Sequence, residues 1–237
     1  MKILVMNGSA RRGKSITLKI THAFLEGFCE ADQNAAGGET ATVEEINLYD
    51  KKISPCMADF SCWFKTPGEC VIDDDVREIY ERIEKADLVI WSMPLYVFGI
   101  PSVVAALLDR SMINLKPAID IDERGWSTHP GFAGHPEKHM VIMSGAFPDT
   151  EGNFDGAVFQ MRRNFGWNIP VITCPESTLL LYKKSEEILK LAAAYLETAR
   201  QAGRQMRNSG KIEDETIREL NSCMMDRDAY IAFTNGR

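Results

Sequence analysis

The residues of this chain best suited to hold an anion lie in its first turn, at residues 8–17. The turn follows an apolar run at 3–5, precedes a segment with helical spacing, and is rich in Gly, Ser, Thr and positive charge. The N–H groups that open a helix have no partner within the helix, and the helix dipole makes that end partially positive. The sequence therefore predicts a bound phosphate at this turn, with an ordinary polar turn as the alternative.

Two kinds of phosphate fit this turn. Gly8, Gly13, Lys14 and Ser15 match the spacing of the nucleoside triphosphate loop, G-x-x-x-x-G-K-[ST]. The hydroxyls of the segments 9–11 and 15–17 instead bracket Arg11, which suits a single phosphate monoester. A triphosphatase also needs an acid that supports magnesium at the end of a neighbouring apolar strand, and the runs ending at 92–94 and 144–145 supply none. The monoester is therefore favoured.

A second group of residues suited to binding follows the apolar run at 86–91. The segment 92–101 contains two prolines and one glycine, which oppose regular structure, yet it is strongly apolar and aromatic. Such a loop usually covers a flat ligand, and a buried connection under the sheet is the alternative. The sequence thus places an apolar, aromatic surface beside a phosphate site if the two segments meet.

The elements that position these segments alternate between strands and helices. Strands are expected at 3–5, 42–48, 86–91, 139–144 and 169–174, and helices at 15–30, from 76, from 101, at 154–167, along the stripe 188–199 and at 213–230. This alternation predicts an α/β fold with a doubly wound parallel sheet and helices on both faces. Ligands of such sheets bind beyond the carboxyl ends of the strands, where the turn and the loops after the third and fourth strands gather. A phosphate joined to a flat hydrophobic ring, as in FMN, meets that description.

Length and composition indicate the number of domains, the compartment and the class of partner. We expect the 237 residues to form one domain, with a core at about 1–206 and a C-terminal helical extension at about 211–237. The absence of a long apolar run and of a signal-peptide pattern predicts a cytoplasmic protein without a membrane segment. A net charge of −7 disfavours nucleic acid as a partner, so a small anion is the expected ligand. The irregular segment 113–138 is interpreted as a lid or subunit contact, and its histidines, His129 and His135, as solvated side chains.

The ordered combination of these motifs resembles the flavodoxin-like NAD(P)H-dependent FMN reductases and their relatives, the iron–sulfur flavoproteins. The resemblance spans residues 1–174 and includes the first turn, the segments 68–75 and 86–96, and the Leu-Asp-Arg at 108–110. It implies strand order 2-1-3-4-5, FMN at the carboxyl edge, and a homodimer or homotetramer whose second subunit helps to enclose the flavin. It also implies contacts to FMN through Ser9, Arg11, Ser15, Ile16 and Thr17 at the phosphate and Pro94, Leu95, Tyr96, Val97, Phe98, Gly145 and Phe147 at the ring.

The reaction implied by the resemblance needs no catalytic acid or base from the protein. Hydride would pass from NAD(P)H to FMN, and electrons would then reach a small acceptor such as free flavin, a quinone, a nitro compound or an iron complex. A flavin-binding electron carrier without enzymatic activity and the triphosphatase remain the alternatives.

The loop between the second strand and the following helix contains three cysteines. Cluster-bearing relatives have four close cysteines, whereas this chain has Cys56, Asp59, Cys62 and Cys70. Because iron–sulfur clusters take four thiolates in most proteins, the sequence disfavours a cluster. Reduced thiols packed in the loop are the expected state, with a redox-active pair as the alternative.

Overall fold

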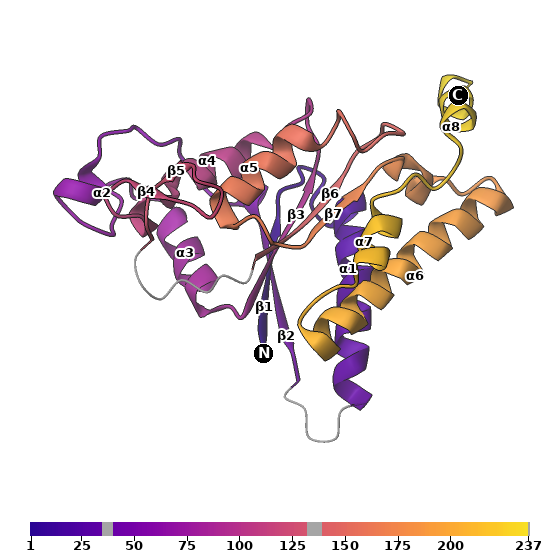
Figure 1. The fold of residues 1–237 in the computed structure, drawn as a ribbon, viewed down its shortest axis with the longest axis horizontal. Helices are drawn as coiled ribbons and strands as arrows, with labels where there is room; N and C mark the ends of the chain where they lie inside the picture. The colour runs from indigo at the N-terminus through magenta and orange to yellow at the C-terminus, as the bar shows by residue number, and fades with distance from the viewer. Residues whose placement is uncertain (35–39, 132–138, 237) are drawn as a thin grey trace.

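The computed structural model describes residues 1–34, 40–131 and 139–236, which form a parallel sheet between two layers of helices (Figure 1). The strands of the sheet are β1 (Lys2–Asn7), β2 (Thr42–Asn47), β3 (Leu88–Pro94), β6 (His139–Ser144) and β7 (Val171–Cys174). All neighbouring pairs are parallel, in the order β2-β1-β3-β6-β7. The predicted order 2-1-3-4-5 is therefore confirmed.

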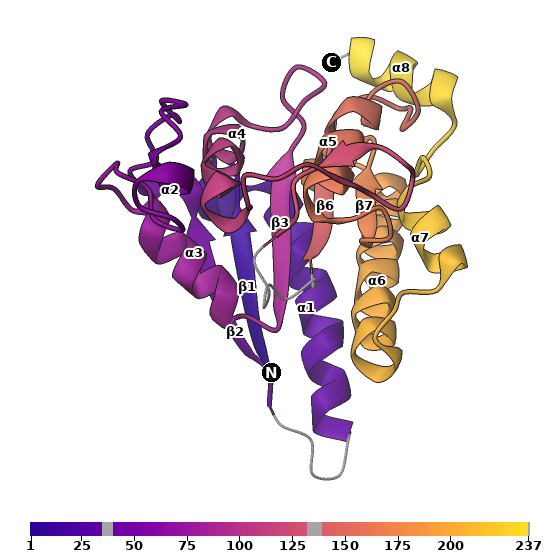
Figure 2. The same cartoon turned by 60° about the vertical axis from the view of Figure 1, so that its left-hand side comes forward.

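The helices divide between the two faces of the sheet, as the two views show (Figures 1 and 2). One face is covered by α1 (Ile16–Asn34) and α6 (Glu186–Ser209), and the other by α3 (Val76–Lys85), α4 (Ser102–Asp109) and α5 (Asp155–Phe165). The remaining helices are α2 (Ser61–Phe64), α7 (Asp214–Leu220) and α8 (Arg227–Asn235). Burial on both faces explains the apolar runs of β1, β3, β6 and β7, whereas the edge strand β2 is mostly exposed and carries charged residues.

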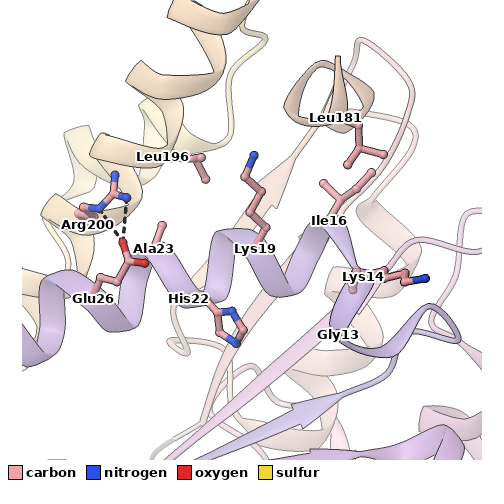
Figure 3. A pocket seen from close by; sticks show the side chains of 11 residues that line it. Gly13, Lys14, Ile16, Lys19, His22, Ala23, Glu26, Leu181, Leu196 and Arg200 are labelled. Atoms are coloured by element: carbon pink, nitrogen blue, oxygen red, sulfur yellow. Dashed lines mark hydrogen bonds and ion pairs between the residues drawn. The ribbon is translucent and has the colours of Figure 1, made fainter. Parts of the chain in front are cut away.

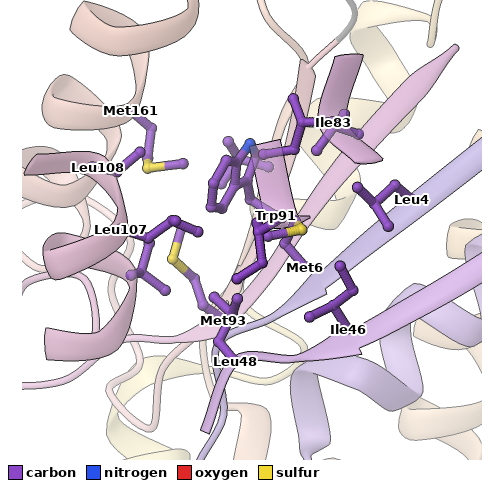
Figure 4. Close-up of a cluster of buried hydrophobic side chains, with 14 of the residues drawn as sticks. Leu4, Met6, Ile46, Leu48, Ile83, Trp91, Met93, Leu107, Leu108 and Met161 are labelled. Atoms are coloured by element: carbon purple, nitrogen blue, oxygen red, sulfur yellow. The ribbon is translucent and has the colours of Figure 1, made fainter. Parts of the chain in front are cut away.

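Alternate residues of β1 supply the two cores. Ile3 and Val5 pack with α1 and α6, whereas Leu4 and Met6 pack with α3, α4 and α5. Figure 4 shows the second core around Trp91. Each core is built from buried apolar side chains, and the two cores hold the sheet that positions the loops at its edge.

Two glycines let α1 and α6 cross at close range. A Cβ atom at Gly27 would lie 2.0 Å from the carbonyl oxygen of Arg200, and one at Gly203 would lie 1.9 Å from that of Phe24. No side chain fits in that space, so the crossing requires glycine on both helices. The position of α1, which begins at the predicted phosphate turn, is fixed by this contact.

Two segments differ from the sequence-based expectation. The helix expected at 213–230 is two helices, α7 and α8, because the chain turns between residues 221 and 226. The segment 113–138, expected to be irregular, contains a two-stranded hairpin of β4 (Asp120–Ile121) and β5 (Ser127–Thr128). Residues 132–138, which include His135, lie outside the described residues, and the lid or subunit contact stays a prediction.

Candidate functional site

The loops after β1, β3 and β6 begin at one edge of the sheet. Pro94 pairs with Ser144, so β3 and β6 end level, and Asn7 at the end of β1 pairs with Ser92, two residues before the end of β3. The first residue of each loop continues the ladder: Gly8 N donates to Ser92 O at 2.9 Å, and Leu95 N to Ser144 O at 2.8 Å. The predicted phosphate turn and the predicted ring loops therefore meet.

The first turn is held by its own hydroxyl and amide groups. The side chain of Asn7 accepts a hydrogen bond from Ser9 N at 3.1 Å, and Ser9 Oγ accepts one from Arg11 N at 3.2 Å. Ser15 Oγ accepts one from Leu18 N at 3.3 Å, as a helix-capping serine does. Both serine oxygens act here as acceptors, so their hydroxyl hydrogens can still be donated to an anion.

The two arginines of the turn differ in whether their side chains are already paired with an acid. The guanidinium of Arg12 is bound to the carboxylate of Asp50, and Arg12 has a φ of 50°. Within the described residues, Arg11 has no side-chain partner and is exposed at the turn. Arg11 is therefore the arginine free to bind a phosphate.

The first N–H groups of α1 complete this cradle. Within the described part of the chain, no acceptor bonds the N–H of Ile16 or of Thr17. The hydroxyl of Thr17 is fully buried and lies 2.6 Å from that of Ser144, so it connects α1 to β6. Thr17 is thus left with its backbone N–H as the group available to an anion. Two hydroxyls, one guanidinium and two amides suit a phosphate monoester.

Lys14, on which the triphosphate alternative depends, lies outside this cradle. Its side chain is exposed and extends from the turn to solvent (Figure 3). The hollow drawn there, of about 390 Å³, lies on the outer side of α1 against α6. Lys19 beside it donates to the carbonyl oxygen of Leu180 at 3.0 Å. This hollow borders the cradle at Ser15 and Ile16 and extends from there along the outer side of α1.

The loop after β3 is a two-residue hairpin turn with an unusual backbone. Tyr96 and Gly99 exchange two backbone hydrogen bonds of 2.9 Å, and between them Val97 and Phe98 have φ values of 48° and 62°. Two positive φ values in such a turn are typical of type I′, where Asn and Gly are preferred. Val97 is 94% exposed and Phe98 51% exposed. The turn therefore presents apolar side chains at a strained position, as functional loops often do.

The loop after β6 contacts this turn through an aromatic pair. The rings of Phe98 and Phe147 stack with their centroids 5.5 Å apart and their planes 14° apart. Gly145 has no room for a side chain, since a Cβ atom would lie 2.9 Å from the ring of Phe154. Of the predicted ring residues, Tyr96, Val97, Phe98 and Phe147 are exposed and form an apolar ledge at the sheet edge, whereas Gly145 is buried and Leu95 packs against the core.

The cysteine loop is anchored by a buried ion pair. The guanidinium of Arg110 lies 3.0 Å from the carboxylate of Asp74, and both side chains are fully buried. Burial would raise the pKa of Asp74, but bonds from Arg110 and from the N–H groups of Ser54 and Val76 outweigh it and lower that pKa. Arg110 Nε also donates to Cys70 Sγ at 3.1 Å.

The thiols of this loop influence one another. Burial raises the pKa of Cys62, and the neighbouring Cys70 and Cys56 raise it further. Among the residues that the structure describes, no group of three or more His, Cys, Asp or Glu side chains is placed to hold a metal ion. A redox-active pair in this loop stays a prediction.

Every helix in the described parts of the chain is too short or too polar to span a bilayer.

The sheet order and the helices on both faces define a flavodoxin-like fold, and the cradle after β1 and the aromatic ledge lie at the edge where such sheets bind ligands. The chain belongs to the family of NADPH-dependent FMN reductases, whose model matches residues 1–181. The predicted resemblance is therefore confirmed.

Individual relatives match this chain over part of its length. An iron–sulfur flavoprotein of Methanosarcina thermophila is 39% identical over 113 residues, which are 48% of this chain and 53% of that protein. An FMN-dependent NADH:quinone oxidoreductase 1 of Bacillus cereus is 29% identical over 124 residues, 47% of this chain and 55% of that protein. The chain thus spans about half the length of the curated relatives it matches.

Solved structures agree with the fold. An NAD(P)H:quinone oxidoreductase from Methanothermobacter marburgensis superposes with a TM-score of 0.61 at 20% identity. The match covers 88% of this chain and 98% of that one. At this level of identity the likeness shows the shared fold.

Proposed function

We propose that this protein binds FMN at the carboxyl edge of its sheet and acts as an NAD(P)H-dependent oxidoreductase. The observation that carries the proposal is the cradle formed by Ser9, Arg11, Ser15 and the first amides of α1, beside the exposed aromatic ledge. Family membership and the flavin-dependent relatives support the same ligand. Neither the triphosphatase nor the electron carrier finds support in the relatives.

The protein's own groups would bind and orient the cofactor. Hydroxyls of Ser9 and Ser15, the guanidinium of Arg11 and the N–H groups of Ile16 and Thr17 would hold the phosphate. The ring would lie against the segment 94–98 and the loop residues Gly145 and Phe147. Bound FMN would accept hydride from NAD(P)H and deliver electrons to a small acceptor such as free flavin, a quinone, a nitro compound or an iron complex.

We further propose a homodimer or homotetramer in which a second subunit covers the ledge. Exposed apolar side chains at Val97, Phe98 and Phe147 support this arrangement, because grouped apolar residues at a surface mark contact sites. We propose the reducing cytoplasm as the compartment, where thiols such as those of Cys56, Cys62 and Cys70 stay reduced.

Titration of the apoprotein with FMN tests the cradle, using two variants of the same turn. Arg11→Ala removes the unpaired guanidinium and is expected to weaken FMN binding about tenfold to a hundredfold, since hydrogen bonds to charged groups contribute about 1.5–3 kcal/mol. Lys14→Ala removes an equal charge outside the cradle and should change the dissociation constant less than about twofold.

The visible spectrum of the purified protein provides an independent measurement. Flavin absorption bands are expected. In the titration, equal weakening of FMN binding by Arg11→Ala and Lys14→Ala would show that general positive charge, and not the cradle, binds FMN. A colourless protein that binds ATP with magnesium, and loses that binding in Lys14→Ala, would refute the proposal.

A further inference from the structure

The C-terminal segment of residues 221–230, which we call the strap, lies against the loop that follows β6. Of its residues, Asn221 accepts a hydrogen bond from Thr150 Oγ1 at 2.6 Å through its carbonyl oxygen. The side chain of Asn221 accepts another from Thr173 N at 2.7 Å. The family model ends at residue 181, so the strap lies outside the part of the chain that the family defines.

Four successive carbonyl groups of the loop, at residues 145–148, accept hydrogen bonds. The carbonyl oxygens of Gly145 and Phe147 accept from the N–H groups of Ser177 and Glu176, each at 2.9 Å. These two donors belong to the turn after β7. Every second carbonyl of the loop is therefore held by that turn.

The intervening carbonyls are held by the strap. The phenol of Tyr230 donates to the carbonyl oxygen of Ala146 at 2.5 Å, and the thiol of Cys223 donates to that of Pro148. Tyr230 is 2% exposed, and its oxygen also lies 2.8 Å from Thr178 Oγ1. Because a phenol has one hydrogen, Thr178 donates to Tyr230 while Tyr230 donates to the loop.

A buried carboxylate ties the strap to the turn after β7. Glu176 is fully buried with a φ of 51°, and its Oε2 accepts from the N–H groups of Met224 at 2.7 Å and Met225 at 3.0 Å. The turn and the strap are thereby joined, so all four carbonyls of the loop are held by one connected structure. An alternating set of bonds of this kind fixes the orientation of each peptide plane.

The orientation of those planes decides what the loop presents on its exposed side. In a trans peptide the N–H points opposite to the carbonyl of the same plane. The N–H groups of Ala146 and Phe147 have no acceptor within the described residues, and both residues are exposed. Because the turn after β7 holds the carbonyl of Gly145 and the strap holds that of Ala146, these two N–H groups point away from both supports.

We propose that Tyr230 is a positioning residue for the flavin site, acting through the strap to hold the loop after β6. The inference rests on the proposed function, because it takes the ledge to be the surface on which the FMN ring lies. The hydrogen bond of Tyr230 goes to Ala146, which is not one of the residues expected to line the ring. It fixes the peptide between Ala146 and Phe147, whose N–H then faces the ligand and whose side chain stacks on Phe98.

Two tyrosine variants distinguish positioning from general stability. Tyr230→Phe and Tyr195→Phe each delete a hydrogen bond from a buried phenol to a backbone carbonyl, since Tyr195 donates to the carbonyl oxygen of Leu220 at 2.8 Å. Only the first of these carbonyls belongs to the loop. Tyr230→Phe also removes the acceptor of the Thr178 hydroxyl. Tyr230→Phe is expected to raise the FMN dissociation constant at least fivefold and to shift the visible bands of bound FMN. Tyr195→Phe should leave both within twofold of the wild type and unshifted.

Hydrogen exchange of the apoprotein measures the loop without FMN. The N–H groups of Glu176 and Ser177 are protected only while the loop carbonyls stay in place, so Tyr230→Phe should speed their exchange at least tenfold. Tyr195→Phe should leave their exchange unchanged. If the wild type fails to bind FMN, the proposed function fails while this measurement still decides whether the strap holds the loop.

A second pair of variants covers the case in which Tyr230→Phe fails to fold. Cys223→Ala removes the donor to Pro148, and Cys223→Ser retains one. Weaker FMN binding in Cys223→Ala that is restored in Cys223→Ser supports the strap. Unchanged FMN affinity and unchanged exchange in Tyr230→Phe, or equal changes in Tyr195→Phe, would overturn the inference.

Discussion

The turn at Val97 and Phe98 combines two side chains with a backbone conformation that disfavours them. A left-handed backbone costs an L residue about 1–2 kcal/mol, and a β-branched residue such as Val97, at a φ of 48°, is among the least suited. Asn tolerates this region because its short polar side chain hydrogen-bonds locally. Since Val97 is 94% exposed, Val97→Asn loses almost no buried surface. We therefore expect the variant to raise the free energy of unfolding by about 1 kcal/mol.

Urea unfolding at equilibrium measures this change, with thermal unfolding expected to shift upward by about 2–4 °C for a chain of this size. Val71→Asn is the control, because Val71 is also exposed, at 50%, and does not have a positive φ. The control should stay within about 0.5 kcal/mol of the wild type. A stability of Val97→Asn equal to or below that of the wild type would refute the assignment of strain to this turn.

FMN affinity of the same variant tells whether the strain serves binding. In the proposed function the Val97 side chain lines the ring, so Val97→Asn should bind FMN more weakly although it is more stable. A substitution that relieves strain at a functional residue commonly makes the protein more stable and its function weaker.

Three further changes test the scaffold. Gly203→Ala should destabilise the protein by at least about 2 kcal/mol in urea unfolding, because its Cβ atom would collide with the carbonyl of Phe24; a neutral effect would contradict the close crossing. Arg110→Leu should cost about 3–5 kcal/mol, since it leaves Asp74 as a buried unpaired charge, and the double change with Asp74→Leu should recover part of that loss. Burial raises the pKa of Glu176 and outweighs the N–H groups of Met225 and Met224, which lower it, while Asp149 and Asp226 raise it further. The contribution of Glu176 to stability is therefore present below about pH 4.5 and is lost as pH rises through the higher folded pKa. Urea unfolding between pH 4 and 8 should therefore show a loss that Glu176→Gln abolishes, and an equal pH dependence in both proteins would count against it.

The sheet and its edge could be predicted from the sequence because they depend on local patterns. Apolar runs bounded by loops mark β3 and β6, and alternation with helices predicts a parallel sheet, while the strand order was implied by the resemblance to a known family. Once the order is known, the positions of Ser9, Tyr96 and Gly145 follow from the rule that loops after parallel strands share an edge. Bringing those residues together required no knowledge of side-chain contacts.

Finer features of the site depend on contacts that leave no local pattern. The family resemblance predicts Thr17 as a phosphate ligand. In the structure its hydroxyl is buried against that of Ser144, which is 127 residues further along the chain. The turn at Val97 lacks the Asn-Gly signal that normally predicts type I′ geometry. In both cases the tertiary structure overrides what the local residues prefer.

The strap was missed for a related reason. Glu176 binds the N–H groups of Met224 and Met225, and any residue except proline provides an N–H. The helix expected at 213–230 also concealed the turn at 221–226 from which these donors come. A clue remained in Glu176 itself, a carboxylate directly after a buried strand, since a buried acid needs partners.

The two loops that form the ledge are held in place in different ways. The Val97–Phe98 turn is fixed within itself, by two backbone bonds and a backbone under strain, whereas residues 145–148 are fixed from outside by the strap. The Phe98–Phe147 stack is where these two supports meet. A flat ligand at the ledge therefore meets two surfaces whose orientations are set before it binds, which lowers the entropy lost on binding. Residues beyond the part of the chain that the family model matches can in this way set the orientation of loops that lie within it.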